Sequence, residues 1–200
     1  MVEVIPESYV AQLDLPKIFG RIAPLDVDLG CSDGAFLIAL AERSPERNFL
    51  GIEREASRVD KACRKAGPER TGGRIDNVRI LHLETSYAVR YLLPEQSVET
   101  FYLLFPDPWP KRRHRGRRVM SPDFLESIHR AMAANGILQI ATDQRDYFQQ
   151  MQRYAQDDPR FELITGQKEG ALPTTKFERI FLEQGLPIYR LGLRKVSPVI

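Results

Sequence analysis

The stretch LDVDLGCSDGAFLIAL, residues 25–40, joins two segments of different periodicity. Its first six residues form a short apolar run typical of a strand, and residues 35–40 begin a segment with the apolar spacing of a helix. Gly30 and Gly34 lie in the connection, where glycine permits left-handed dihedrals and a close approach of the backbone to a ligand. The helix would present free N–H groups to the same place. We therefore expect an α/β fold with a small-molecule site at this loop.

Strand-like and helix-like segments alternate along the rest of the chain. Apolar runs that predict strands lie at 25–30, 48–53, 77–84, 97–105 and 136–143. Segments with helical periodicity lie between and after them, at 35–44, 55–67, 85–93, 121–136 and 146–158. This alternation predicts right-handed crossovers and a mostly parallel, doubly wound sheet. Two further runs, at 161–165 and 188–196, predict a closing antiparallel hairpin beside the five-stranded core.

The helix expected at 121–136 has signals at both ends. Ser121 can cap its first turn, and Pro122 suits the first helical position. Asn135 and Gly136 supply a left-handed stop, so we expect the helix to end there.

Polar or acidic residues follow each predicted parallel strand. They are Gly30 to Gly34, Glu53, Glu84, Asp107 and Asp143. Ligands of doubly wound sheets bind beyond the carboxyl ends of the strands, so we expect these residues to share one site. Glu53 ends the second strand, where dinucleotide folds place the acid that binds ribose hydroxyls. An adenosine-containing cofactor is therefore predicted.

The first loop favours one such cofactor over another. A pyrophosphate-binding loop reads G-x-G-x-x-G, whereas this loop reads G-C-S-D-G and carries the acid Asp33. That carboxylate would repel phosphates. S-adenosylmethionine has no phosphate and carries two positive groups that Asp28 and Asp33 would attract, so we favour it over a nicotinamide dinucleotide.

Length and composition indicate one domain over residues 1–200, because 42% of the residues are hydrophobic and 28% are charged. No stretch approaches the roughly 20 apolar residues that cross a bilayer, and the N-terminus lacks signal-peptide features. We therefore expect a cytoplasmic protein with no membrane partner. Cys31 and Cys63 have neither metal-ligand nor redox spacing, so no metal is predicted. The oligomeric state is not predicted.

Residues 105–119, FPDPWPKRRHRGRRV, combine rigidity with charge. Three prolines restrict the backbone around Asp107. Six lysines and arginines then occur within residues 111–118, and removing them from the net charge of +2 leaves −4 on the rest of the chain. A mildly acidic body with one basic segment predicts a directed contact with phosphates. Trp109 suits either stacking on a base or packing within the loop.

The pieces DLGCSDG, NFLGIE, FPDPWPKRRHRGRR, ATD and TKFERIFLEQGLPIYR occur in this order along the chain. Together they resemble bacterial tRNA (guanine-N7-)-methyltransferases, the TrmB family, and the proline-rich piece with its basic run is the most specific. The resemblance implies a Rossmann-like class I methyltransferase fold with a seven-stranded, mostly parallel sheet and an antiparallel C-terminal strand. It also implies S-adenosyl-L-methionine as methyl donor and the variable-loop guanine of tRNA as acceptor.

The resemblance also carries family positions onto this chain. Together with the glycines of the first loop, the family positions give the expected cofactor-binding residues Asp28, Gly30, Gly34, Glu53, Glu84 and Asp107. The resemblance implies that Asp107 is also catalytic. It implies substrate binding by Lys111, Asp143, Thr175, Lys176, Phe177 and Glu178. It implies RNA contact by Arg112, Arg113, His114, Arg115, Arg117 and Arg118. Two residues depart from the family pattern: Ser32 replaces a second glycine, and Glu84 replaces an aspartate.

The chemistry of the acceptor defines what Asp107 has to do. Guanine N7 carries a lone pair and no proton, so its methylation needs no general base. Positive charge moves from the sulfonium to the guanine, and a fixed carboxylate would stabilise it there. The same carboxylate can accept hydrogen bonds from the Watson–Crick edge and so turn N7 toward the methyl group.

Two other functions fit parts of the pattern. A non-catalytic RNA-binding module would keep the fold and the basic segment without methyl transfer. A nicotinamide-dependent oxidoreductase is disfavoured by Asp33 and by the absence of G-x-G-x-x-G.

Overall fold

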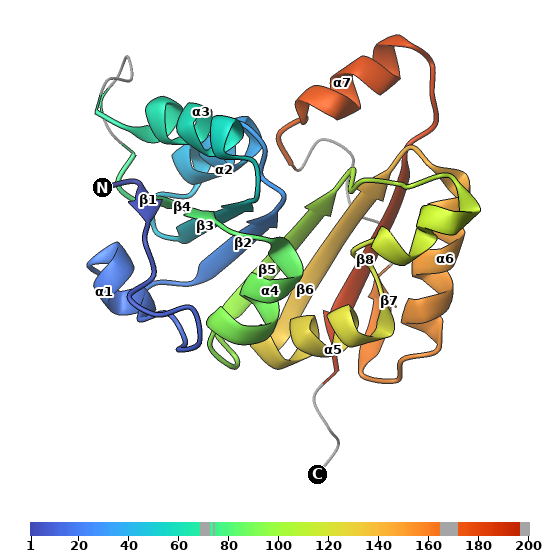
Figure 1. Ribbon diagram of the computed structural model, residues 1–200, viewed down its shortest axis with the longest axis horizontal. Coiled ribbons are helices and arrows are strands. Elements are labelled where there is room, and N and C mark those ends of the chain that lie inside the picture. Colours follow the sequence, from blue (N-terminus) through green and yellow to red (C-terminus); the bar gives the residue numbers. More distant parts are fainter. Residues whose placement is uncertain (69–72, 74, 165–171, 197–200) are drawn as a thin grey trace.

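The computed structural model describes residues 1–68, 73, 75–164 and 172–196. Within these residues the chain forms one eight-stranded sheet of order β1-β4-β3-β2-β5-β6-β8-β7 (Figure 1). The strands are β1 (Glu3–Val4), β2 (Leu25–Leu29), β3 (Asn48–Glu53), β4 (Val78–His82), β5 (Val98–Leu104), β6 (Met132–Thr142), β7 (Phe161–Ile164) and β8 (Tyr189–Lys195). The predicted mostly parallel α/β sheet is confirmed. The extra strand is β1, whose two residues are too few to show alternation in the sequence.

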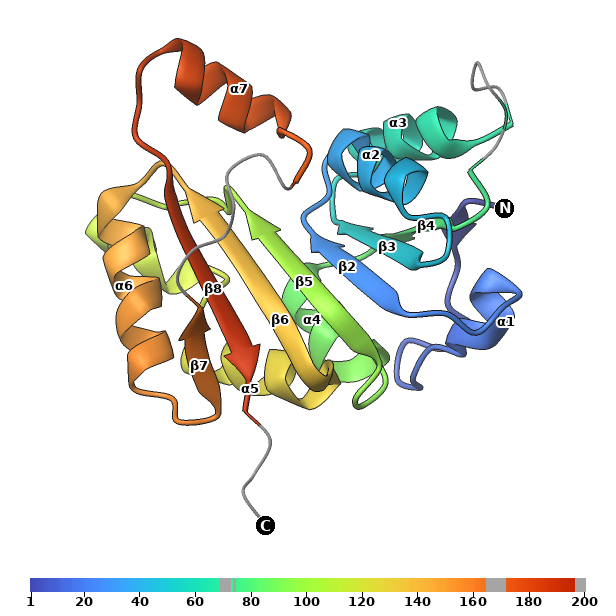
Figure 2. The ribbon, with the colours of Figure 1, turned by 180° about the vertical axis from the view of Figure 1, so that it is seen from behind.

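Helices cover both faces of the sheet (Figures 1 and 2). They are α1 (Leu15–Phe19), α2 (Ala35–Arg43), α3 (Ala56–Ala66), α4 (Thr85–Tyr87) with a π-helical turn at Ala88–Leu92, α5 (Pro122–Ala131), α6 (Arg145–Gln156) and α7 (Lys176–Glu183). Apolar residues of α2 and α3 pack in one buried cluster, and those of the π-helical turn, α5 and α6 pack in a second. No helix in the described ranges combines the length and apolar character that crossing a membrane requires.

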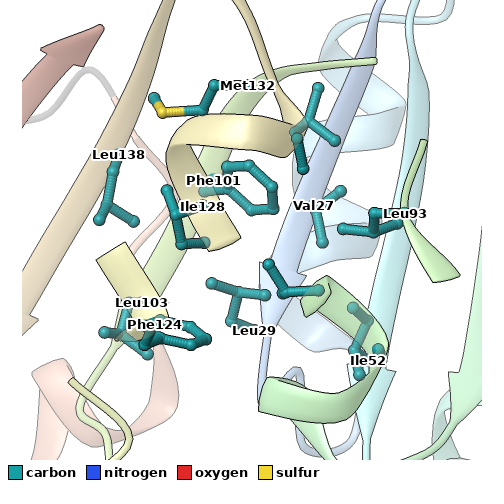
Figure 3. Close-up of a cluster of buried hydrophobic side chains, with 14 of the residues drawn as sticks. Val27, Leu29, Ile52, Leu93, Phe101, Leu103, Phe124, Ile128, Met132 and Leu138 are labelled. Carbon is teal, nitrogen blue, oxygen red and sulfur yellow. The ribbon is translucent and has the colours of Figure 1, made fainter. Parts of the chain in front are cut away.

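The larger cluster holds the central strands against α5. Figure 3 shows Val27 of β2, Phe101 of β5, and Phe124 and Ile128 of α5 within it. Val27, Phe101 and Ile128 are fully buried, and burial of each such side chain contributes about 1.5–3 kcal/mol. This packing fixes the carboxyl ends of β2 and β5 relative to each other.

The strand order changes direction between β2 and β5. These two strands pair in parallel, with Val27 opposite Phe101, while β3 and β4 extend to one side and β6 and β8 to the other. Crossovers on the two sides therefore leave a crevice at the carboxyl ends of β2 and β5, which is where α/β sheets bind ligands.

The C-terminal strands form the predicted antiparallel closure. Strand β8 pairs antiparallel with β6 and with β7, and thus lies between them rather than at the edge. The expectation of an antiparallel C-terminal strand is confirmed.

The predicted end of the helix that begins at Pro122 was wrong. Helix α5 ends at Ala131, and β6 starts at Met132, which pairs with Val98 of β5. Asn135 does adopt the left-handed conformation, with φ of 60°, but inside the strand. A Cβ on Gly136 would lie 3.0 Å from the Ala133 carbonyl oxygen and 3.2 Å from that of Val98, so glycine suits a close approach of the backbone where the β5–β6 register shifts rather than a helix stop.

Candidate active site

A cavity of about 840 Å³ lies at the carboxyl ends of β2, β3 and β5. Its lining brings together ten of the residues predicted from the sequence, which are Asp28, Gly30, Glu53, Glu84, Asp107, Arg117, Arg118, Thr175, Lys176 and Phe177. These residues come from distant parts of the chain and meet because parallel strands end at the same edge. Asp143, Lys111 and Glu178 lie outside this lining.

Glu53 fastens the first loop to the end of β3. Its carboxylate accepts hydrogen bonds from the backbone N–H of Ser32 at 2.9 Å and of Glu55 at 2.9 Å. The side chain is buried, and Arg58 approaches it to 3.9 Å. Each carboxylate oxygen has a further lone pair, so Glu53 can still accept a hydrogen bond from a ligand hydroxyl.

Asp28 is a buried carboxylate beside Glu53. Burial, followed by the charge of Glu53, raises the pKa of Asp28 to about 7. No residue in the described ranges donates a hydrogen bond to its carboxylate. A cationic group placed here would stabilise the ionised form, because an opposite charge lowers the pKa of a carboxyl group.

Asp33 lines the same cavity but has a partner. Lys65 of α3 lies 2.5 Å from its carboxylate, so the negative charge that the loop presents is partly balanced. The repulsion of phosphate predicted from Asp33 is correspondingly weaker, and Asp28 is the buried carboxyl group to which no described residue donates a hydrogen bond.

The two loop glycines have different surroundings. Gly30 lines the cavity with φ of 82°, and a Cβ at this position would meet no atom within 4 Å. Gly34 caps α2 with φ of 72°, and a Cβ there would lie 2.9 Å from Cβ of Ala62 in α3. Gly30 therefore leaves room for a ligand, whereas Gly34 allows α2 and α3 to pack closely.

Glu84 combines a structural contact with a place in the cavity. Its carboxylate caps α4 by accepting a hydrogen bond from the Tyr87 N–H at 2.8 Å. Glu84 also lines the cavity, and a carboxylate has lone pairs beyond the one that this cap uses. It can therefore accept a hydrogen bond from a ligand while it holds the start of α4.

Asp107 lies in a loop whose backbone is constrained on both sides. Phe105 precedes it with φ of 52°, and Trp109 follows it with φ of 40°, both in the left-handed region that aromatic residues rarely adopt. The Phe105 N–H donates to the Ala141 carbonyl of β6 at 2.7 Å. The Asp107 carboxylate forms an ion pair with Arg54 at 3.1 Å. Arg54 was missed in the sequence, although it directly follows Glu53 at a strand end.

The basic segment, residues 111–118, contains a 3₁₀ helix at Arg112–Arg117. Lys111, Arg112, Arg113, Arg115 and Arg117 are exposed. Trp109 packs against this segment, with the Arg117 guanidinium 5.0 Å from its ring centroid and the His114 ring at 5.9 Å. The tryptophan thus links the loop of Asp107 to the basic segment and also lines the cavity.

Arg118 does not lie with the exposed cations. Its side chain is 2% exposed, and its guanidinium donates to the Pro108 carbonyl at 2.7 Å and pairs with Asp146 at 2.7 Å. The sequence grouped Arg118 with the RNA-contacting residues, whereas in the structure its guanidinium is bound by Pro108 and Asp146, and Arg118 lines the cavity beside Arg117. A position among other cations carries no signal of this burial.

Helix α7 places its first residues over the cavity. Thr175 and Glu178 form a capping box, in which the Thr175 hydroxyl accepts from the Glu178 N–H at 3.0 Å. Glu178 also pairs with Arg190 of β8, so its role in the structure is to hold the helix start. Thr175, Lys176 and Phe177 are left to line the cavity. The T-x-x-E spacing of a capping box was present in the sequence.

Asp143 lies apart from this lining. Asp143 follows β6 and its carboxylate accepts a hydrogen bond from the side chain of its neighbour Gln144. No cluster of three His, Cys, Asp or Glu side chains suited to a metal ion occurs in the part of the chain that the structure describes.

Comparison with known proteins agrees with this geometry. The model of a family described as "Putative methyltransferase" matches residues 22–191. A tRNA (guanine-N(7)-)-methyltransferase of Halorhodospira halophila is 38% identical over 95% of this chain and 82% of its own length. The enzyme of the same name from Leifsonia xyli is 38% identical over 91% of this chain and 81% of its own.

Solved structures give the same fold. The 16S rRNA methyltransferase KamB superposes with a TM-score of 0.64 at 18% identity, covering 94% of this chain and 95% of that one. The antibiotic-resistance methyltransferase Kmr gives a TM-score of 0.63 at 16% identity, over 96% and 95% of the two chains. The fold is thus the Rossmann-like class I methyltransferase fold, and by sequence the chain belongs to the tRNA (guanine-N(7)-)-methyltransferase family.

Proposed function

We propose that this protein transfers a methyl group from S-adenosyl-L-methionine to N7 of the variable-loop guanine of tRNA. The observation that carries the proposal is the single cavity whose lining joins Asp28 and Glu53 to Asp107, with the exposed cations of the basic segment next along the chain. One part of this lining suits a cationic adenosine compound and the other suits a nucleic-acid base.

The residues of the first loop and β3 fit the donor. Asp28 supplies a buried charge without a described hydrogen-bond donor, Glu53 retains lone pairs for ribose hydroxyls, and Gly30 leaves open space. Glu84 offers a further carboxylate beyond the end of β4. When bound, S-adenosylmethionine supplies an activated methyl group on a sulfonium.

Asp107 acts by orientation and charge rather than as a base. Its carboxylate is held in place by the prolines on both sides and by the left-handed backbone at Phe105 and Trp109. When guanine binds, the carboxylate releases Arg54 and accepts hydrogen bonds from the N–H groups of the guanine edge. It then stabilises the positive charge that develops on the base. Positioning two reactants in this way contributes on the order of 7–11 kcal/mol of barrier reduction.

The exposed cations bind the tRNA backbone. Removal of a guanine from its stack costs a few kcal/mol. Phosphate contacts by Lys111, Arg112, Arg113, Arg115 and Arg117 offset that cost and place the base over the cavity. Trp109, at the cavity wall and under Arg117, is then positioned to contact the extruded nucleotide.

The proposed substrate indicates where in the cell the protein acts, and the sheet indicates how many domains it has. Because tRNA is cytoplasmic, we place the protein in the cytoplasm. We treat residues 1–200 as one methyltransferase domain, since the strands that carry the cavity belong to a single sheet.

Labelled-methyl transfer onto unmodified tRNA tests the proposal. Strand cleavage specific for N7-methylguanine then locates the label, and a tRNA lacking the variable-loop guanine is the matched substrate control. Asp107→Ala should abolish transfer while RNA affinity stays within about threefold of wild type. Asp123→Ala, an exposed acid in the first turn of α5, is the matched protein control and should transfer normally. Label on another atom refutes the proposal, and RNA binding without any transfer by the wild-type protein identifies a non-catalytic RNA-binding module.

A further inference from the structure

One cation of the basic segment faces inward. Arg118 has a side chain that is 2% exposed, whereas that of Arg115, three residues earlier, is 51% exposed. A buried guanidinium is retained in a fold when its donors find acceptors. The acceptors of Arg118 therefore show what it holds together.

Arg118 reaches the loop of Asp107 on one side. Its Nε donates to the carbonyl of Pro108 at 2.7 Å, and Pro108 is the residue that directly follows Asp107. Proline has no N–H, so the carbonyl of Pro108 is its one backbone group able to form such an anchor.

Helix α6 holds Arg118 on the other side. Nη1 donates to Gln150 at 2.5 Å, and Nη2 donates to Asp146 at 2.7 Å. The guanidinium also lies 4.5 Å from the ring centroid of Tyr147, which is fully buried. Asp146, Tyr147 and Gln150 occupy consecutive turns of α6, so one helix supplies all three contacts.

A second bond fastens the chain just beyond Arg118. The hydroxyl of Tyr147 accepts from the backbone N–H of Met120 at 3.1 Å. The segment from Pro108 to Met120 is thus held near α6 at both of its ends, while the exposed cations lie between them. RNA that binds these cations would therefore contact a segment whose two ends are held in place by hydrogen bonds.

We propose that Arg118 is a positioning residue for methyl transfer. By binding the Pro108 carbonyl and α6 together, it fixes the carboxylate of Asp107 at the cavity and makes no contact with RNA itself. The inference rests on the function proposed above. Lysine cannot replace it, because a single ammonium lacks the planar set of donors that reaches a carbonyl, an amide and a carboxylate at once.

Trp109 provides a readout that is independent of activity. It is the only tryptophan in the chain and lies two residues from Asp107, so its fluorescence reports the order of this loop. The test compares Arg118→Lys with wild type by tryptophan anisotropy, acrylamide quenching, kcat and the KM for tRNA. If the first variant is poorly folded, Asp146→Asn perturbs the same contacts from α6, at a more exposed carboxylate that pairs with Arg118 at 2.7 Å and with Arg115 at 3.4 Å.

Arg130→Lys is the matched control. Arg130 also donates to several carbonyls, those of Val89 at 2.7 Å and Leu93 at 2.9 Å among them, but none belongs to the loop of Asp107. This variant should lower thermal stability while Trp109 fluorescence and kcat stay near wild type.

The expected result is a kcat about tenfold lower for Arg118→Lys, a KM for tRNA changed less than threefold, and greater quenching of Trp109. Asp146→Asn should show the same pattern to a smaller degree. The inference is overturned if Trp109 and kcat respond to Arg118→Lys no more than to Arg130→Lys, or if the KM for tRNA changes instead of kcat. A wild-type protein without methyl transfer would refute the proposed function, whereas the quenching of Trp109 would still decide whether Arg118 orders the loop.

Discussion

The guanidinium of Arg54 lies 3.1 Å from the carboxylate of Asp107, and the two side chains are 57% and 65% exposed. This pair joins the residue after β3 to the loop after β5, and both of its members line the cavity. The same loop is also held by Arg118, whose side chain is 2% exposed. Two arginines therefore contact one loop in very different surroundings.

This difference predicts unequal effects on stability. Exposed ion pairs contribute about 0–1 kcal/mol, so Arg54→Ala should change the free energy of unfolding by less than about 1 kcal/mol. Arg118→Met leaves the Pro108 carbonyl without its donor and should cost about 2–4 kcal/mol. Urea unfolding of both variants measures the two values, and equal losses would contradict the assigned burial.

The salt dependence of tRNA binding should reflect the exposed cations alone. Each phosphate contact contributes about −0.9 to the slope of log K against log salt on duplex-like RNA. Arg113→Gln should therefore make the slope shallower by about one contact, since Arg113 is exposed. Arg130→Gln removes a cation outside the basic segment and serves as the control. Fluorescence anisotropy with labelled tRNA at several salt concentrations gives the slopes. Equal slopes for Arg113→Gln and Arg130→Gln would contradict phosphate binding by the basic segment.

The raised pKa of Asp28 predicts a pH dependence of stability. The unfolded value is 3.8 and the folded value is about 7, so the folded state holds the proton more tightly. The contribution of Asp28 to the free energy of unfolding is therefore fully present below pH 3.8 and is lost as the pH rises toward 7. Asp28→Asn removes that loss and should be more stable than wild type by a few kcal/mol at pH 8, with a smaller difference near pH 4. Thermal unfolding of both proteins across this range checks the sign, and parallel curves would contradict it.

The two loop glycines should respond differently to alanine. Gly30→Ala meets no neighbour and should cost about 1–2 kcal/mol through its left-handed backbone, while also weakening cofactor binding. Gly34→Ala adds a contact of 2.9 Å with Ala62 and should cost more. Ala62→Gly should recover part of the loss at position 34 and none at position 30. Unfolding free energies from a double-mutant cycle measure this coupling, and additive effects would rule out the contact.

Features determined by local sequence were predicted well. The ends of the parallel strands followed from apolar runs, and they correctly placed Glu53, Glu84 and Asp107 at one edge of the sheet. The cap of α5 at Ser121 was also predicted, since its hydroxyl accepts from the Phe124 N–H at 3.1 Å. Such signals lie within a few residues of the feature they determine.

Features determined by distant contacts were not predicted. The end of α5 depends on the pairing of Met132 with Val98, and local signals at Asn135 favoured a longer helix. Arg118 has the same sequence surroundings as the exposed arginines beside it, and its burial depends on acceptors in α6. The ion pair of Arg54 with Asp107 likewise joins residues 53 positions apart.

Because Phe105 and Trp109 have left-handed backbones, substitutions there that raise stability are expected to lower activity. Glycine or asparagine adopts such dihedrals at lower cost, and a residue held there unfavourably costs on the order of 1–3 kcal/mol. A library selected for heat resistance alone should therefore enrich these residues at positions 105 and 109. The enriched variants would lose the aromatic contacts of Phe105 with Phe181 and of Trp109 with Arg117, and with them the fixed geometry around Asp107.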